Sequence, residues 1–167
     1  MGRDNLSDDC LTAEQRARVL IDTQLAAAGW SVQDKKNLNL FASEGVACRE
    51  AVMAPGHGRA DYLLYIDQKA VGVIEAKPMG TTLSGVEWQS AKSADGLPAE
   101  VRLRAQTVDG KRPFVFEASG SEIRFTNGFD PEPRARRIFN FPSLRHWRDC
   151  TGMQKLILST NVAREGT

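Results

Sequence analysis

Long apolar runs, metal-binding clusters and targeting signals are the features that this sequence lacks. No apolar stretch approaches the roughly 20 residues that a membrane-spanning helix needs, and the opening MGRDNLSDDC contains no apolar signal-peptide core. The chain has only two histidines and three widely spaced cysteines, with no Cys-x-x-Cys pair. A structural zinc site therefore lacks its usual ligands, and we expect a reduced, cytoplasmic protein with free thiols.

An excess of charge of either sign is also absent. The 22 Lys and Arg residues nearly balance the 21 Asp and Glu residues, so the formal net charge is +1. This balance excludes a strongly basic tail-type nucleic-acid binder and an acidic disordered protein, but it does not exclude a local basic groove. The 167 residues, 41% of them hydrophobic, suffice for one globular domain with a buried core.

The clearest local signal is a helix near the N-terminus, expected over 11–28. Thr12 and Gln15 have the spacing of a capping box, and Gly29 is a typical residue at a helix end. The other expected elements are mostly strands, since their segments are rich in Tyr, Leu, Ile, Val and Phe. In chain order these elements are an extended segment 47–53, strands 60–66 and 70–75, a helix 84–94, and strands 114–117 and 123–126.

Charged residues stand at the open end of the first expected hairpin. If its short turn centres on Gln68, antiparallel pairing places Asp61 directly opposite Glu75. Arg59 then lies opposite Lys77. Because side chains alternate along a strand, all four project from one face.

Asp61 and Glu75 together predict a cation site. Directly opposed side chains have Cβ atoms about 5 Å apart, and two carboxylates that close repel each other unless a positive charge lies between them. Mg²⁺ takes oxygen ligands from one or two carboxylates, and Lys77 beside them could hold a phosphate oxygen or orient a water nucleophile. The alternative is a solvent-exposed charge cluster at a sheet edge. Both strands are almost continuously apolar, which indicates burial on both faces and favours a functional role.

Glu14 lies at the head of the apolar stripe of the first helix. At about 100° per residue it shares a face with Ala17, Ile21 and Leu25. It is either a first-turn acid that complements the helix dipole or a third carboxylate that reaches toward the metal site. The sequence leaves both interpretations open.

The same hairpin resembles the core of a nuclease superfamily. Asp61 followed by Glu75-Ala76-Lys77 is similar to the D…ExK motif of PD-(D/E)xK nucleases. The longer run GRADYLLYIDQKAVGVIEAKP, after a helix ending in LAAAGW and before PEPRARRIFNFPSL, resembles the N-terminal nuclease domain of type I restriction enzyme R subunits. The resemblance covers roughly 12–148. It implies an α/β, restriction-endonuclease-like fold, with a central mixed β-sheet flanked by helices.

The resemblance also implies roles for the residues of this motif. Asp61, Glu75 and the backbone carbonyl of Ala76 would be ligands of Mg²⁺. Lys77 would activate or place the attacking water.

Two further residues match catalytic positions of such nucleases. Glu14 matches the acidic residue on the first helix, and Gln89 matches the glutamine of a QxxxY motif on the helix after the core. The sequence departs from the pattern at Ala60, where the superfamily name has proline, and at Ser93, where the QxxxY motif has tyrosine.

The implied activity is that of a Mg²⁺-dependent endonuclease domain acting on double-stranded DNA. Its implied partners are the motor region of a full-length R subunit and the methyltransferase and specificity subunits, with no membrane. The sequence contains no G-x-x-x-x-G-K-[ST] loop, so ATP, like S-adenosylmethionine, would act only through such a holoenzyme and would not bind this chain. The expected organisation is a flexible N-terminus 1–11, a nuclease domain 12–148, and a C-terminal tail or linker 149–167 without a motor domain.

Two other functions stay open at this point. One is a non-catalytic assembly or DNA-docking module that keeps a nuclease fold, and the other is a stand-alone nuclease of the junction-resolvase or repair type. The segment 131–150 could contact DNA phosphates or be a solvated linker. It carries five arginines, namely Arg134, Arg136, Arg137, Arg145 and Arg148.

Overall fold

The computed structural model describes residues 11–56, 58–83, 96–98, 101, 114–128 and 130–150. Its strands are β1 (Ser31–Asp34), β2 (Gly45–Val52), β3 (Arg59–Ile66), β4 (Lys69–Ala76), β5 (Phe114–Ala118), β6 (Ile123–Asn127) and β7 (Arg136–Ile138). Its helices are α1 (Ala13–Ala27), the short 3₁₀ helix η1 (Lys35–Asn37) and α4 (Leu144–Cys150). No helix within these ranges is long and apolar enough to cross a membrane.

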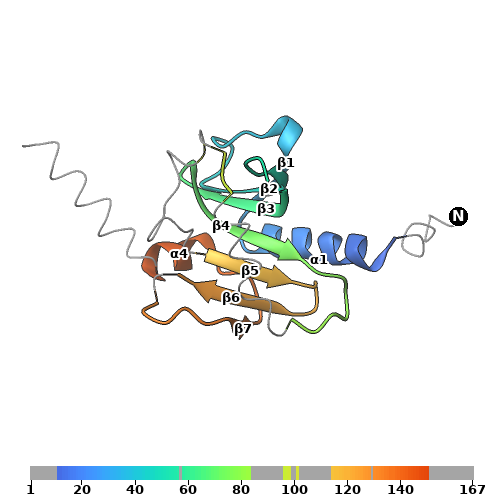
Figure 1. The fold of residues 1–167 in the computed structure, drawn as a ribbon. Coiled ribbons are helices and arrows are strands. Elements are labelled where there is room, and N and C mark those ends of the chain that lie inside the picture. The colour runs from blue at the N-terminus through green and yellow to red at the C-terminus, as the bar shows by residue number, and fades with distance from the viewer. Residues whose placement is uncertain are drawn as a thin grey trace, which may run out of the picture.

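The seven strands form one sheet whose spatial order follows the chain, from β1 at one edge to β7 at the other (Figure 1). β1 pairs with β2 and β4 pairs with β5 in parallel, and the remaining neighbours are antiparallel. Helix α1 packs on the sheet, and α4 lies beside the start of β5 (Figure 1). The expected α/β fold with a central mixed sheet is therefore confirmed.

The capping box fixes the start of α1 as the sequence predicts. The Thr12 hydroxyl accepts a hydrogen bond from the Gln15 backbone N–H at 3.2 Å, and the Gln15 side chain accepts one from the Thr12 N–H at 2.8 Å. The helix stops before Gly29, whose φ of 95° belongs to the left-handed region that favours glycine. Its apolar stripe of Ala17, Ile21 and Leu25 is fully buried.

Both faces of the sheet are covered by apolar side chains, so β3 and β4 are buried as their sequences indicate. One core lies between the sheet and the two helices; it includes Ile21, Leu25, Tyr62, Phe116 and Trp147. A second core on other side chains of the same strands includes Val46, Cys48, Leu63, Tyr65 and Val73. The strand ends that carry charge therefore belong to strands whose side chains are buried on both faces of the sheet.

The turn of the first hairpin differs from the expected three-residue link. Ile66 pairs with Lys69, so Lys69 belongs to β4 and the turn consists of Asp67 and Gln68 alone. Both turn residues have positive φ, 46° and 67°, as tight two-residue hairpin turns require. A register shift then follows between Leu64 and Tyr65.

This shift restores the pairing that a turn centred on Gln68 would have given. Tyr62 pairs with Ile74, and Leu63 pairs with Val73. The pairing of β3 with β4 ends there, and Asp61 and Glu75 stand one residue further along their strands. The two deviations thus compensate each other at the end of the hairpin that carries charge.

The other expected elements have mixed outcomes. The segment 47–53 lies within or just beyond β2, and the second hairpin is confirmed as β5 and β6. The helix expected over 84–94 lies outside the described residues. Four of the described elements were not expected, and their sequences show no clear periodic pattern: β1, η1, β7 and α4. Helix α4 is fixed mainly by Trp147, which is buried against Trp30 and Phe114 with ring centroids 5.8 and 4.3 Å away.

Candidate active site

Asp61 is the best-anchored carboxylate at the end of the hairpin. Its Oδ2 accepts a hydrogen bond from the backbone N–H of Ala76 at 2.9 Å, and its Oδ1 accepts one from the guanidinium of Arg18 at 2.6 Å. The side chain is 20% exposed. Both oxygens therefore have fixed positions, one set by the backbone of β4 and the other by a side chain of α1.

The ionised form of Asp61 is disfavoured despite these two partners. Burial is the main cause that raises the pKa of the Asp61 carboxyl above its ordinary value. The Ala76 N–H and Arg18 lower that pKa, whereas the nearby charges of Glu14 and Glu75 raise it. Asp61 therefore lies in a site with an excess of negative charge, where a further cation would be stabilising.

Glu75 and Lys77 form an ion pair beside Asp61. The Lys77 ammonium lies 2.5 Å from Glu75 Oε1, and both side chains are about one-quarter to one-third exposed, at 24% and 31%. The backbone N–H of Lys77 donates to the carbonyl of Ala118 at 2.8 Å, which holds the chain against β5 just after β4 ends. The structure thus brings Asp61, Glu75, Ala76 and Lys77 together at the ends of β3 and β4.

Arg18 is the residue that the sequence analysis missed. Its guanidinium lies 2.6 Å from Asp61, 3.0 Å from Glu14 and 3.3 Å from Glu50. Burial lowers the pKa of Arg18, but its three carboxylate partners outweigh burial and raise that pKa above the ordinary value. The four-residue spacing between Glu14 and Arg18 on one helix could have indicated their pairing, although not the contact with Asp61.

Glu14 joins this group through Arg18, and no direct contact with Asp61 is seen. Its side chain is 53% exposed, so it lies at the rim of the core rather than in it. Glu14 is therefore linked to Asp61 through Arg18, whose guanidinium binds both carboxylates.

Glu50 is a second residue that sequence reasoning missed. β2 and β3 pair Arg49 with Tyr62 and Ala51 with Ala60, so Glu50 lies across from Asp61. Its φ of 49° is in the left-handed region, which non-glycine residues adopt rarely and often at functional sites. No local sequence signal marks this backbone conformation, because Glu50 is far from the hairpin motif along the chain.

Mg²⁺ is the metal that the resemblance implies, and the oxygen donors at this site suit it. Asp61, Glu75 and the carbonyl of Ala76 are hard ligands, and Mg²⁺ commonly binds one or two carboxylates while keeping several waters. No cluster of three or more His, Cys, Asp or Glu side chains able to hold a metal occurs within the described ranges. The fit is therefore that of an open site with two carboxylates and not of a closed protein cage.

Gln89 and the arginine-rich segment are not placed beside Asp61, Glu75 and Lys77. Gln89 lies outside the described residues, so its expected role in the site stays a prediction. In the arginine-rich segment, Arg134 pairs with Glu132 at 2.8 Å and Arg136 pairs with Asp130 at 2.9 Å. Part of the local positive charge is thus balanced by acids of the same segment.

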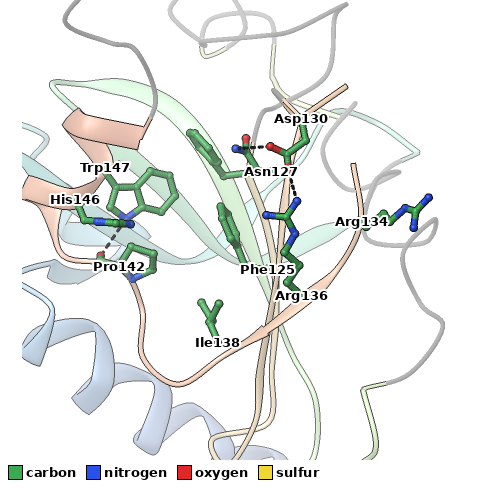
Figure 2. A pocket seen from close by; sticks show the side chains of 10 residues that line it. Phe125, Asn127, Asp130, Arg134, Arg136, Ile138, Pro142, His146 and Trp147 are labelled. Atoms are coloured by element: carbon green, nitrogen blue, oxygen red, sulfur yellow. Dashed lines mark hydrogen bonds and ion pairs between the residues drawn. The ribbon is translucent and has the colours of Figure 1, made fainter. Parts of the chain in front are cut away.

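A cavity of about 250 Å³ lies elsewhere on the sheet (Figure 2). Phe114 is one of its apolar lining residues. Figure 2 shows Phe125 and Trp147 among the others, and it shows Arg136 and Asp130 of the lining paired with each other. Phe114 begins β5, whereas Ala118 at the other end of β5 contacts Lys77. None of the predicted catalytic residues lines this cavity.

Comparison with known proteins identifies the fold. No family model matches the chain, and no curated protein matches it. A solved fragment described as an HsdR subunit of a type I restriction enzyme from Vibrio vulnificus YJ016 does match, with a TM-score of 0.54 and 20% identity. The match covers 81% of this chain and 24% of that one. The fold is that of a restriction-type nuclease.

A second solved structure, the type IIG restriction endonuclease BpuSI, matches with a TM-score of 0.41 and 13% identity over 76% of this chain and 13% of that chain. The chain described here spans about a quarter of the length of the HsdR fragment. The likeness to the HsdR fragment, at 20% identity, establishes the fold alone, and the chemistry has to be argued from the site.

Proposed function

We propose that this chain is a Mg²⁺-dependent endonuclease domain that hydrolyses phosphodiester bonds of double-stranded DNA. The observation that supports this most is the grouping of Asp61, Glu75 and Lys77 at the ends of two adjacent buried strands, with Ala76 fixed to Asp61. Charged side chains at the ends of buried strands are costly unless they have a function or a partner. The restriction-type fold makes phosphodiester cleavage the chemistry to test first.

The metal would be held by Asp61, Glu75 and the carbonyl of Ala76. When bound, it would supply a Lewis acid that polarises the scissile phosphate and lowers the pKa of a bound water. The Ala76 N–H keeps the Asp61 carboxylate in a fixed orientation. Lys77, held against Glu75 and β5, can stabilise negative charge that develops on the phosphate or align the attacking water.

The wider biological setting is part of the same proposal. The chain would act with a motor region and with methyltransferase and specificity subunits, as in the type I systems that it resembles. ATP would be used by the motor, since the sequence has no phosphate-binding P-loop, and S-adenosylmethionine by the modification subunits.

A non-catalytic docking module is the second candidate, and one observation favours it. Asp61 Oδ1 is already bonded to an arginine, which is an arrangement that a fold without metal chemistry could retain. Measurements of metal binding and of DNA cleavage distinguish the two candidates, because only the nuclease requires both.

The test combines plasmid nicking with metal titration. Wild type, Asp61→Asn and Lys77→Met are incubated with supercoiled plasmid and Mg²⁺, with and without EDTA, and Mn²⁺ binding is measured by calorimetry. We expect wild-type nicking to stop with EDTA and to fall about a thousandfold in both variants. Mn²⁺ binding should be lost in Asp61→Asn and kept in Lys77→Met.

Lys69→Met is the matched control, because Lys69 is an exposed lysine at the opposite end of the same strand. It should nick DNA at the wild-type rate. Absence of metal binding by the wild type would refute the proposed nuclease, and nicking that survives Asp61→Asn would refute the assigned roles.

A further inference from the structure

Both carboxylate oxygens of Asp61 already accept a hydrogen bond, so a metal ion has to compete for them. Oδ2 is directed at the backbone N–H of Ala76, at 2.9 Å, and this contact belongs to the strand and cannot move away without disturbing β4. Oδ1 is bonded to Arg18 at 2.6 Å. A cation that approaches Oδ1 therefore meets the positive charge of the guanidinium, and two cations on one oxygen repel each other.

Arg18 has alternative partners on either side. Glu14 lies 3.0 Å away on the same helix, and Glu50 lies 3.3 Å away on β2. A guanidinium has five donors in a planar fork, so it can stay bonded to these two carboxylates after it releases Asp61. Release would not leave a buried charge without a partner, which is the usual reason why such pairs are hard to break.

The charges around the site favour this exchange. Four carboxylates, those of Glu14, Glu50, Asp61 and Glu75, surround two cations, Arg18 and Lys77. These six side chains carry a formal net charge of two negative, and the buried Glu117 of β5 pairs in register with Glu75 beside them, so a divalent ion would reduce their repulsion.

We propose that Arg18 is a positioning residue that exchanges with the metal at Asp61. Without metal, it holds Asp61, Glu14 and Glu50 together and limits their repulsion. With metal, it withdraws to Glu14 and Glu50 and leaves Oδ1 of Asp61 to the ion. This inference rests on the proposed Mg²⁺ site, and it adds Arg18 and Glu50 to the residues that tune it.

Metal titration of Arg18→Met tests the exchange without any activity measurement. Removing the competing guanidinium removes one charge-assisted hydrogen bond that the metal has to displace. We expect the Kd for Mn²⁺ to fall about tenfold in calorimetry. We also expect the metal-free variant to melt at a lower temperature than the wild type and to gain more from added Mg²⁺, because the carboxylates then lack their internal cation.

Arg49→Met is the matched control. Arg49 also bridges carboxylates of α1 and the sheet, Asp22 at 3.1 Å and Asp34 at 2.9 Å, but it does not contact Asp61 in the described structure. Its removal changes the net charge by the same amount. We expect its Kd for Mn²⁺ to stay within about twofold of the wild type, because solvent and salt screen a charge that is not shared with the ligand.

A second measurement uses the wild-type chain and does not depend on the variant folding. Side-chain ¹⁵N NMR of the arginines is recorded during a Mg²⁺ titration, with the Arg18 signal assigned by its loss in Arg18→Lys. The guanidinium signal of Arg18 should shift and saturate with the metal, while that of Arg49 stays in place.

The outcomes separate this inference from the proposed function. The exchange is overturned if metal binding needs Asp61 but is equally tight in Arg18→Met, and if the Arg18 NMR signal does not shift with Mg²⁺. These results would leave the nuclease proposal standing. Absence of metal binding in both the wild type and Arg18→Met overturns the metal site itself.

Discussion

The two ends of β5 have different surroundings, because aromatic side chains pack at its start and charged side chains gather near its other end. At its start, Phe114 and Phe116 pack with Phe125, Phe141 and Trp147, with ring centroids 4.3–5.9 Å apart in the contacts of these two residues. The indole N–H of Trp147 is bonded to the Pro142 carbonyl at 2.9 Å, so even its polar atom has a partner. At the other end, Glu117 and Ala118 pair with Glu75 and Ala76, beside the charged ends of β3 and β4.

The aromatic end gains stability from contacts that are all compatible with one another, since buried rings attract at these separations. The charged end holds Asp61 with a raised pKa, because burial and neighbouring carboxylates oppose its ionisation. A fold keeps such an arrangement where function requires it, at a cost in stability. The comparison therefore associates stability with the aromatic end and the proposed chemistry with the charged end.

The largest expected effect comes from the aromatic end. Trp147→Ala removes the side chain that joins α4 to Trp30 and Phe114, and we expect a loss of about 3–5 kcal/mol in the free energy of unfolding. Urea denaturation measures this loss, and Trp147→Phe should retain part of the stability. The Kd for Mn²⁺ of the folded fraction should stay unchanged. If a Trp147 substitution weakened metal binding without lowering stability, it would contradict the separate roles of the aromatic end and the charged end.

A smaller effect is expected in β4, which runs beside β5 from the aromatic end to the charged end. Gly72 of β4 faces Phe114 of β5, and a Cβ added there would lie 2.5 Å from the Phe114 carbonyl oxygen and 2.9 Å from its Cβ. Both contacts are too short, so Gly72→Ala should force the paired strands apart.

We expect Gly72→Ala to cost about 1–3 kcal/mol in the free energy of unfolding, measured with urea. If the ends of β4 and β5 are coupled through this pairing, the Kd for Mn²⁺ should also rise. Gly80→Ala is the comparison variant, because nothing lies within 4 Å of a Cβ at that position, although its φ of 86° adds local strain. Unchanged stability in Gly72→Ala would contradict the close approach of the strands.

The smallest expected effect has the opposite sign and belongs to the charged end. A raised pKa means that folded Asp61 binds its proton more tightly than unfolded Asp61 does. The stability that this provides is present at acidic pH and is lost as the pH rises from the unfolded pKa through the higher folded pKa. At neutral pH the ionised carboxylate is therefore a net cost, and Asp61→Asn should raise the melting temperature slightly while it abolishes metal binding.

This gain from Asp61→Asn should shrink as the pH falls below about 4, where the carboxyl of the unfolded wild type is protonated. Asp22→Asn is the control, since Asp22 accepts a hydrogen bond from Tyr62 at 2.8 Å and pairs with Arg49 at 3.1 Å. It should lower the free energy of unfolding by about 1 kcal/mol at neutral pH. Thermal melts at several pH values decide, and a loss of stability in Asp61→Asn at neutral pH would contradict the raised pKa.

The elements with strong local signals could be predicted from the sequence. The capping box at Thr12 and the stop at Gly29 mark α1, and two apolar runs separated by a short polar link mark the hairpin of β3 and β4. By contrast, β1 and β7 have only four and three residues, and their sequences, SVQD and RRI, show no alternation that a short window could detect. Such short strands exist because a neighbouring strand pairs with them, which is a property of the tertiary structure.

The candidate site was also predicted in part. Asp61, Glu75 and Lys77 share one hairpin, so a pairing rule was enough to bring them together. The prediction used the wrong turn, and the register shift beside Leu64 corrected it. Arg18 and Glu50 could not be associated with this group in advance, because they lie on α1 and β2 and only the packing of the helix against the sheet places them beside Asp61.

The sequence by itself determined a near-neutral, α/β chain with a buried hairpin that carries two carboxylates and a lysine at one end. These features follow from local rules of helix capping, strand alternation and hairpin pairing, which act over a few neighbouring residues. Only the tertiary structure decided that an arginine stands between the carboxylates and that a strained Glu50 lies across from Asp61. Charge interactions of this kind depend on distance in space and on burial, and neither is a local property of the chain.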